Sequence, residues 1–98
     1  MLFIVQFDDD ATKLDIRAKY LPAHIQFLDS VKERVLVPGS LREIPGDRPV
    51  GGLWIVDAAD EPAVKDLFKD DPFWVNGLRA AVRIYRWNKA FPDRRVLI

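Results

Sequence analysis

The chain has 98 residues, which suits one small domain over residues 1–98 and is too short for two. Apolar residues make up 49% of it, enough for a packed core, so the composition excludes a disordered chain. Fifteen basic and fifteen acidic residues cancel, which leaves no overall field to attract nucleic acid, and the lack of cysteine excludes disulfides, thiolate nucleophiles and cysteine-based zinc sites.

The N-terminal third predicts a strand followed by a helix. "LFIVQF" at 2–7 is an apolar run rich in strand formers, and the aspartates at 8–10 that end it supply capping oxygens for a helix. Apolar side chains then recur at spacings of three and four, and they predict a core-facing stripe of Ile16, Tyr20, Ala23, Phe27 and Val31. Because proline removes a helical hydrogen bond, we expect a kink or a fresh helix start at Pro22.

The middle of the chain predicts two strands joined by a loop. "VLVPGSL" at 35–41 has the composition of a strand, and we expect Pro38 and Gly39 to break it. The prolines and the Pro-Gly pair of 42–50 predict a loop. "GGLWIVDA" at 51–58 predicts the third strand, whose glycines indicate a close backbone approach or a bulge.

The last third predicts a helix, a turn and a final strand. Asp60 can cap a helix over 61–70, whose early proline falls in the tolerant first turn. "DDPFWVNGL" at 70–78 predicts a turn or short helix, and "AAVRIYRW" at 80–87 predicts the fourth strand. The rest is a tail, and we expect its end, "DRRVLI" at 93–98, to anchor on a partner chain.

The order β-α-β-β-α-β in a short chain predicts an α+β, ferredoxin-like fold: a four-stranded antiparallel sheet with two helices on one face. In the strands at 2–7 and 51–58, apolar residues follow one another instead of alternating with polar ones, so both sheet faces are apolar. Two helices can cover only one face. We therefore expect the open face to pack against a second subunit's sheet in a homodimer.

His24, in "YLPAHIQFLDS", is the only histidine. An unperturbed imidazole titrates near neutral pH, so this side chain is suited to general acid–base catalysis. A lone histidine on a core-facing helix stripe is more often structural, and the residues alone leave both interpretations open. One histidine among scattered carboxylates lacks the spacing of a metal site, so we expect no metal and no cofactor.

Asp70, Asp71 and Pro72 form the second candidate. Two carboxylates before a proline are commonly a solvated turn. The functional alternative is that one of them orients His24 and stabilises its charged form. In this fold the first helix and the end of the second lie on the same side of the sheet, which makes the meeting possible.

Three other patterns are weaker evidence for a function. The glycine-rich stretch 38–52 matches neither a phosphate loop nor a dinucleotide fingerprint. Ser40 has no second histidine to complete a hydrolase triad, but it can donate a hydrogen bond to a ligand. The arginines and aromatic residues of 79–87 suggest a nucleic-acid face, which the balanced charge disfavours, so we expect no nucleic-acid partner.

Several of these features occur together in one known arrangement. The β-α-β-β-α-β order, "HIQFL", "VPGSL", a glycine that opens the third strand and "DDPF" together resemble the YciI-like family from the first strand to Trp87. His24 matches the histidine of that family's R-x-x-H-L type segment, with Ile25 for the leucine and Arg17, one turn further back, as the nearest arginine. Asp71 matches the aspartate of its Asp-Pro-aromatic motif. Pro38-Gly39-Ser40 stands where the family usually has Gly-Pro.

The resemblance implies a ferredoxin-like dimer of the dimeric α+β barrel type, with a site centred on His24 and Asp71. It implies acid–base chemistry on small compounds, cyclic ones included, such as elimination or isomerisation. In this hypothesis His24 is the acid or base, Asp71 fixes its tautomer, and Ser40 with nearby backbone holds a substrate oxygen in a cleft lined by aromatic residues. Gly39, Gly51 and Phe73 complete the expected substrate-binding set.

One alternative belongs to another class: a non-catalytic dimeric module that binds a small metabolite or a partner protein. Such a module would tolerate His24→Gln and Asp71→Asn. A purely structural assembly domain would have no cleft at all. Dimeric α+β barrels also include heme proteins, but nothing beyond the lone histidine favours heme. No apolar run is long enough for a bilayer span and "MLFIVQFDDD" lacks a signal-peptide pattern, so we expect a cytoplasmic protein with no membrane partner.

Overall fold

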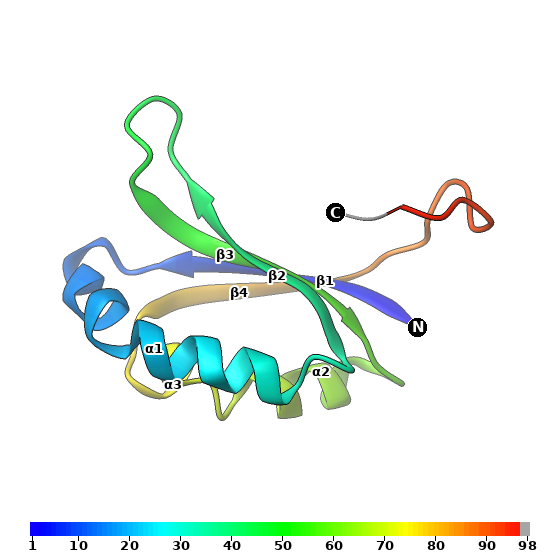
Figure 1. The fold of residues 1–98 in the computed structure, drawn as a ribbon, viewed down its shortest axis with the longest axis horizontal. Helices are drawn as coiled ribbons and strands as arrows, with labels where there is room; N and C mark the ends of the chain where they lie inside the picture. Colours follow the sequence, from blue (N-terminus) through cyan, green and yellow to red (C-terminus); the bar gives the residue numbers. More distant parts are fainter. Residues whose placement is uncertain (97–98) are drawn as a thin grey trace.

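Four antiparallel strands form one sheet in the order β2-β3-β1-β4 (Figure 1). The structure, a computed structural model, describes residues 1–96. The strands are β1 (Leu2–Asp9), β2 (Val35–Arg42), β3 (Pro49–Asp57) and β4 (Arg79–Arg86). The helices are α1 (Leu14–Ser30), α2 (Glu61–Phe68) and the short α3 (Pro72–Val75), with a 3-10 turn at Ala11–Lys13 before α1.

All three helices lie on one face of the sheet, below it in Figure 1. The element order and the topology confirm the predicted α+β, ferredoxin-like fold. The predicted cap of α2 is also present, because the Asp60 side chain accepts a hydrogen bond from the Ala63 backbone N–H at 2.9 Å.

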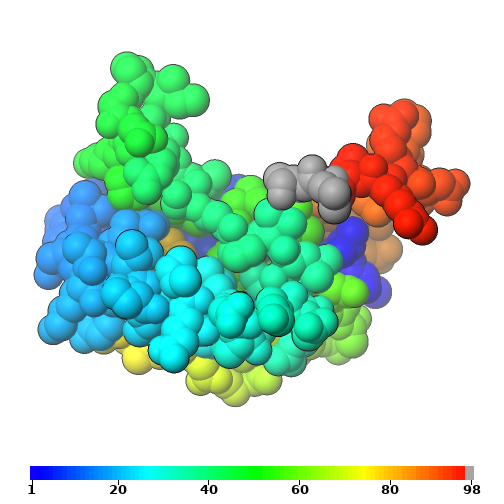
Figure 2. Space-filling view, viewed as in Figure 1, coloured from blue at the N-terminus to red at the C-terminus, as the bar shows by residue number. Residues whose placement is uncertain are grey.

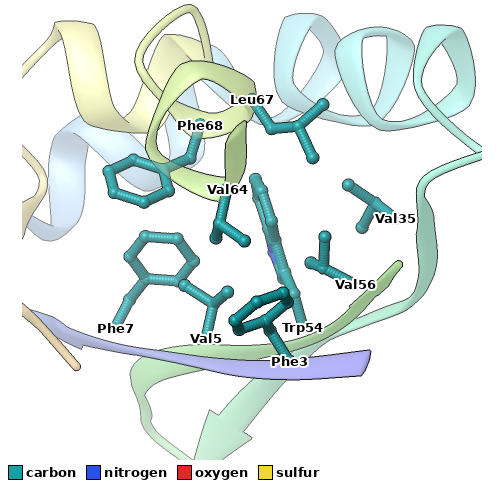
Figure 3. Packing of buried hydrophobic residues seen from close by; sticks show 9 residues of the cluster. All are labelled: Phe3, Val5, Phe7, Val35, Trp54, Val56, Val64, Leu67 and Phe68. Carbon is teal, nitrogen blue, oxygen red and sulfur yellow. The ribbon is translucent and has the colours of Figure 1, made fainter. Parts of the chain in front are cut away.

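The apolar core lies between the sheet and α2 (Figure 3). Alternate residues of β1 point into it, because successive side chains of a strand face opposite sides. Phe7 makes edge-to-face contacts there with Trp54 and Phe68, at centroid distances of 5.0 and 5.5 Å. The other members of this core are Phe3, Val5, Val35, Val56, Val64 and Leu67.

A fresh helix start at Pro22 and a strand break at Pro38 were wrong predictions, whereas a kink at Pro22 stays a prediction. α1 does not restart at Pro22 but runs through it, and Ala18, whose carbonyl loses its helical partner, is exposed so that water can bond to it. β2 is not broken at Pro38, which stays in register with Trp54. Because β2 is an edge strand, a residue without an N–H can face solvent there.

The predicted stripe on α1 is also incorrect in part. Ala23 is exposed, and Ile16, Tyr20, Phe27 and Val31 are only partly buried. The one buried residue of this helix is His24. The helix therefore turns a titratable side chain, and not its apolar row, most deeply toward the sheet.

The opposite face of the sheet has no helix over it within residues 1–96 (Figure 1). The strand registers place Ile4, Leu53, Ile55 and Tyr85 on this face, beside the ion pair of Asp8 and Arg83. We call it the open face. Its apolar centre agrees with the consecutive apolar residues in the sequence.

Two segments project from the sheet (Figures 1 and 2). One is the hairpin tip between β2 and β3, where Ile44 is 97% exposed. The other is the tail after β4, exposed at residues 87–96. Its predicted anchoring on a partner stays a prediction, and residues 97–98 of that stretch lie outside the described residues. No helix within the described chain is long and apolar enough to cross a membrane.

Candidate active site

His24 and Asp71 form a hydrogen-bonded pair, as the sequence analysis anticipated. Nδ1 of the imidazole lies 2.7 Å from Oδ1 of the carboxylate, and the two side chains are 8% and 1% exposed. Because an ionised carboxylate only accepts hydrogen bonds, Nδ1 carries the proton and donates it. The other ring nitrogen, Nε2, is then an acceptor that can take up a proton.

The short helix α3 fixes this pair from one side. Asp71 caps α3, because its Oδ1 also accepts a hydrogen bond from the Phe73 backbone N–H at 3.1 Å. Pro72 occupies the first turn of the helix, where its missing N–H costs nothing. The Phe73 ring stacks on the His24 ring, with centroids 3.8 Å apart and planes within 12°. α1 packs against α3, so the imidazole is held by a hydrogen bond to the residue that caps α3 and by a stack from a residue inside it.

A second buried ionic group lies next to this pair. The Asp9 carboxylate is shared by two guanidinium groups, those of Arg17 and Arg79, each at 2.7 Å. The side chains of Asp9 and Arg79 are 1% and 2% exposed. Burial lowers the pKa of Arg79, and the hydrogen bond and charge of Asp9 oppose that shift. The aspartate therefore compensates charges that would be unfavourable if left alone in this interior.

Phe73 joins the two groups. The guanidinium carbons of Arg17 and Arg79 each lie 5.2 Å from the centre of its ring. The same ring stacks on the imidazole of His24. Asp71 also acts through its charge on Arg79. Within residues 1–96, two buried polar atoms of these groups, Asp71 Oδ2 and Arg79 Nε, have no hydrogen-bond partner. The imidazole thus lies beside an arginine-rich interior.

A pocket of about 250 Å³ opens between α1 and β2, and His24 is one of the residues that line it. Its aliphatic wall consists of Leu21, Ile25, Leu28 and Pro38. Its polar lining consists of Arg17, His24, Ser40, Arg42 and Arg79, with Gly39 beside them. The expected aromatic lining is absent from this pocket, and Phe73, which was expected to line it, stacks on the imidazole instead.

The expected site residues occupy three kinds of position. His24, Ser40 and Gly39 line the pocket. Asp71 and Phe73 lie behind the imidazole and hold it. Gly51 lies away from the pocket lining: its carbonyl accepts a hydrogen bond from Arg17 at 3.1 Å, and a Cβ there would be 2.0 Å from the Phe7 carbonyl oxygen. This glycine allows β1 and β3 to approach each other.

Sequence reasoning missed Asp9, Arg42 and Arg79 as site residues. Asp9 was expected to cap a helix, but β1 continues through it and turns its side chain inward. Asp10 is the residue that caps, accepting a hydrogen bond from the Thr12 backbone N–H at 2.9 Å. The sequence does contain a signal for the pair of Asp9 and Arg79. Charged residues adjoin apolar strands at 8–10 and at 79, and charged side chains at the end of a buried strand can themselves be buried when they pair with each other. Among the described residues, no cluster of histidine and carboxylate side chains could hold a metal ion.

One protein-family model matches nearly the whole chain. The model of the YCII-related domain matches residues 1–88. Among curated proteins, none matches the chain in sequence.

The solved structures that are similar to this one include two from bacteria. The first is 5-chloro-2-hydroxyhydroquinone dehydrochlorinase (TftG) from Burkholderia phenoliruptrix, in complex with 2,5-dihydroxybenzoquinone, with a TM-score of 0.82 and 27% identity over 90% of this chain and 94% of that one. The second is a Bacteroides thetaiotaomicron protein assigned by its name to the antibiotic biosynthesis monooxygenases, with a TM-score of 0.59 and 20% identity over 99% and 95% of the two chains. The second likeness concerns the fold alone.

Proposed function

Because the chain belongs to the YCII-related family, we propose that it is an enzyme in which His24 transfers a proton to and from a small organic compound bound between α1 and β2. One observation carries this proposal. A buried carboxylate holds Nδ1 of a pocket-lining imidazole at 2.7 Å, which leaves Nε2 for a bound molecule. The similarity to a dehydrochlorinase supports small-molecule chemistry in this fold.

The proposed reaction is an elimination or isomerisation. Nε2 of His24 removes a proton from a carbon of the substrate, and the electron pair of that C–H bond forms a new double bond. In an elimination, a leaving group departs with the electrons of its own bond; in an isomerisation, the imidazolium returns the proton to another atom. Asp71 stabilises the imidazolium and keeps the ring oriented through both steps. Small compounds, cyclic ones included, match the pocket volume of about 250 Å³.

Substrate contacts follow from the lining of the pocket. Ser40 and the backbone at Gly39 face the bound molecule from β2. Phe73 does not contact the substrate but positions the imidazole on which it stacks. Gly51 likewise positions Arg17, whose guanidinium donates a hydrogen bond to the Gly51 carbonyl. No cofactor has a role in the proposed chemistry.

We also propose that the protein works as a homodimer whose sheets meet through the open face. Ile4, Leu53 and Ile55 form an apolar centre there, which water solvates poorly. A second copy of the same face would cover it on both subunits at once, as two-fold symmetry requires. The molar mass in solution tests this directly.

A second candidate function is favoured by the low exposure of the imidazole. The His24 residue is only 7% exposed, as a structural histidine would be. In that case the protein binds a small metabolite without transforming it, and the pair serves to hold α1 against α3.

The two candidates differ in what His24→Gln does. We would screen small compounds with acidic C–H bonds for deuterium incorporation in heavy water and for loss of a leaving group, and then compare variants on the active compounds. We expect His24→Gln to lower the rate by about a hundredfold to ten-thousandfold, since a positioned base contributes that much. Gln26→Ala, an exposed change on the same helix, is the control and should keep full activity.

Unchanged turnover in His24→Gln would remove the imidazole from the reaction. Ligand binding that survives in His24→Gln, together with no turnover of any compound by the native protein, would instead support the binding module.

A further inference from the structure

The polar side chains that line the pocket between α1 and β2 are, with one exception, hydrogen-bond donors. Three are guanidinium groups and one is the hydroxyl of Ser40, while the exception is His24. The neighbouring carboxylates, Asp9 and Asp71, are buried behind these groups and do not line the pocket. A molecule that satisfies this lining must supply acceptors, and a carboxylate or an ionised hydroxyl supplies the strongest.

We propose that this pocket binds a small organic anion, whose charged oxygen lies against Ser40 and Arg42 and whose hydrocarbon part lies against α1. The inference rests on the proposed function in using the same pocket, and it names the chemical class of the ligand. It also assigns Arg42, at the end of β2, as a specificity-determining residue.

The contact between Ser40 and Arg42 carries the first part of the argument. Nε of Arg42 donates a hydrogen bond to the Ser40 hydroxyl oxygen at 3.2 Å. A serine hydroxyl that accepts in this way keeps its own proton free to donate. One terminal nitrogen of Arg42 donates to the Asp47 carbonyl at 3.0 Å, and within residues 1–96 the other makes no hydrogen bond. The pair therefore offers two donors to one oxygen.

The charge of the site carries the second part. Three guanidinium groups, those of Arg17, Arg42 and Arg79, adjoin two buried carboxylates, which leaves one positive charge in excess when His24 is neutral. Within residues 1–96, Asp47 is the one carboxylate that forms an ion pair with Arg42, at 3.7 Å, and its side chain is 82% exposed. Water screens such a contact, so it compensates little of the charge. An anion that enters the pocket completes the compensation.

The aliphatic wall decides between organic and inorganic anions. Leu21 and Ile25 are 43% and 56% exposed although they line the pocket, and Leu28 continues the wall toward the core. These side chains would lose water if a ring or an alkyl group covered them, which favours binding. Phosphate or sulfate would satisfy the arginines but leave the wall wet. The pocket therefore fits a carboxylate, phenolate or enolate that carries a hydrocarbon body.

The same donors would serve the reaction. When His24 removes a proton from a carbon next to a carbonyl or hydroxyl group, negative charge accumulates on that oxygen. Ser40 and Arg42 lie on β2, across the pocket from the imidazole on α1. Base and oxyanion donors thus stand on opposite walls.

A matched pair of probes tests the inference without knowledge of the substrate. Benzoate is an organic anion and benzamide is its neutral isostere, and binding of each is measured by NMR titration of the native protein. We expect benzoate to bind about tenfold or more tightly than benzamide, a difference of about 1.4 kcal/mol. Benzoate binding should weaken as salt is added, since screening reduces the attraction.

Two variants of the hairpin arginines locate the effect. Arg42→Gln should weaken benzoate binding about tenfold and leave benzamide binding unchanged. Arg48→Gln is the control, because Arg48 lies on the same hairpin but pairs with Glu43 at 2.7 Å and does not line the pocket. Equal binding of the two probes, equal effects of the two variants, or no benzoate binding up to about 10 mM would each overturn the inference.

The outcome is separable from that of the proposed function. His24→Gln should lose turnover but keep the preference for benzoate, since the imidazole does not supply the excess charge. Catalysis that depends on His24 without any preference for anions would overturn this inference alone. A preference for anions without any catalysis would overturn the enzyme alone.

Discussion

The helix side of the sheet has two halves that are built in different ways. Under α2 the interior is apolar, and this eight-residue helix buries Val64, Leu67 and Phe68 against the sheet. Under α1 and α3 the interior is charged, and the seventeen-residue α1 buries only His24. The half under α2 can be stabilised by burial of apolar surface alone. In the half under α1 and α3, each buried charged or polar side chain needs a specific partner. The two halves of this small layer are therefore held by different kinds of interaction, apolar burial under α2 and buried charge pairing under α1 and α3.

The largest expected effect comes from the charged half. Asp9→Asn removes the carboxylate that Arg17 and Arg79 share and leaves a buried guanidinium uncompensated. We expect the free energy of unfolding, measured by urea denaturation, to fall by about 3–5 kcal/mol. That loss would equal the loss from truncating a core aromatic residue such as Phe68 under α2.

Asp8→Asn provides the matched control. Asp8 is the preceding residue on β1, and its ion pair with Arg83 is exposed, with both side chains at 44%. This change should cost less than about 1 kcal/mol. Equal losses for the two variants would show that the charged half does not depend on its buried pairing.

A smaller change separates orientation from folding. Asp71→Asn keeps an oxygen that can cap α3, but it replaces the charged acceptor of the Nδ1 proton of His24 by a neutral and weaker one, so the proton is held less strongly at Nδ1. We expect stability to fall by only about 1 kcal/mol, while nitrogen NMR of His24 shows a shift of the neutral ring toward the tautomer protonated at Nε2. Turnover should fall by at least about tenfold, since that tautomer cannot act as the base at Nε2.

The control for this change is Asp70→Asn. Asp70 is exposed and immediately precedes Asp71. It should leave both the tautomer and the rate unchanged. A native tautomer distribution in Asp71→Asn would contradict the orienting role of the carboxylate.

The smallest effect on the fold is expected at the open face. Ile55→Glu places a charge at the centre of that face, so it should change the stability of one subunit little but prevent two sheets from packing together. Analytical ultracentrifugation should show the native dimer and a monomeric variant. Val75→Glu, at a 65% exposed position on α3, is the control and should remain dimeric. A monomeric native protein would contradict the proposed assembly.

Much of the fold was predictable because it rests on local patterns. The strand composition of 2–7 and the Asp60 cap of α2 each depend on neighbouring residues, and both are present as predicted. The fresh helix start at Pro22 and the strand break at Pro38 were wrong because the surroundings of each proline decided the outcome. An exposed helix side and an edge strand both tolerate a missing N–H, and the sequence does not show which side or edge a proline will occupy.

The site was predictable only in part. The pairing of His24 with Asp71 was anticipated through motifs that lie 47 residues apart. The pairing of Asp9 with Arg79 spans 70 residues and follows from the register of β1 with β4, which composition does not reveal. The aromatic cleft was a wrong prediction because Phe73 can either line a pocket or stack on an imidazole, and only the position of α3 selects the stack.

The oxygen Oδ1 of Asp71 has two partners, the Phe73 backbone N–H that begins α3 and the Nδ1 proton of His24. Evolutionary change at α3 is therefore never free of consequences for the imidazole. Any insertion or new residue that moves the start of this helix also moves the atom that aims the ring. Divergence toward new substrates is then easiest on the opposite wall, where β2 and its hairpin can vary without disturbing that shared oxygen.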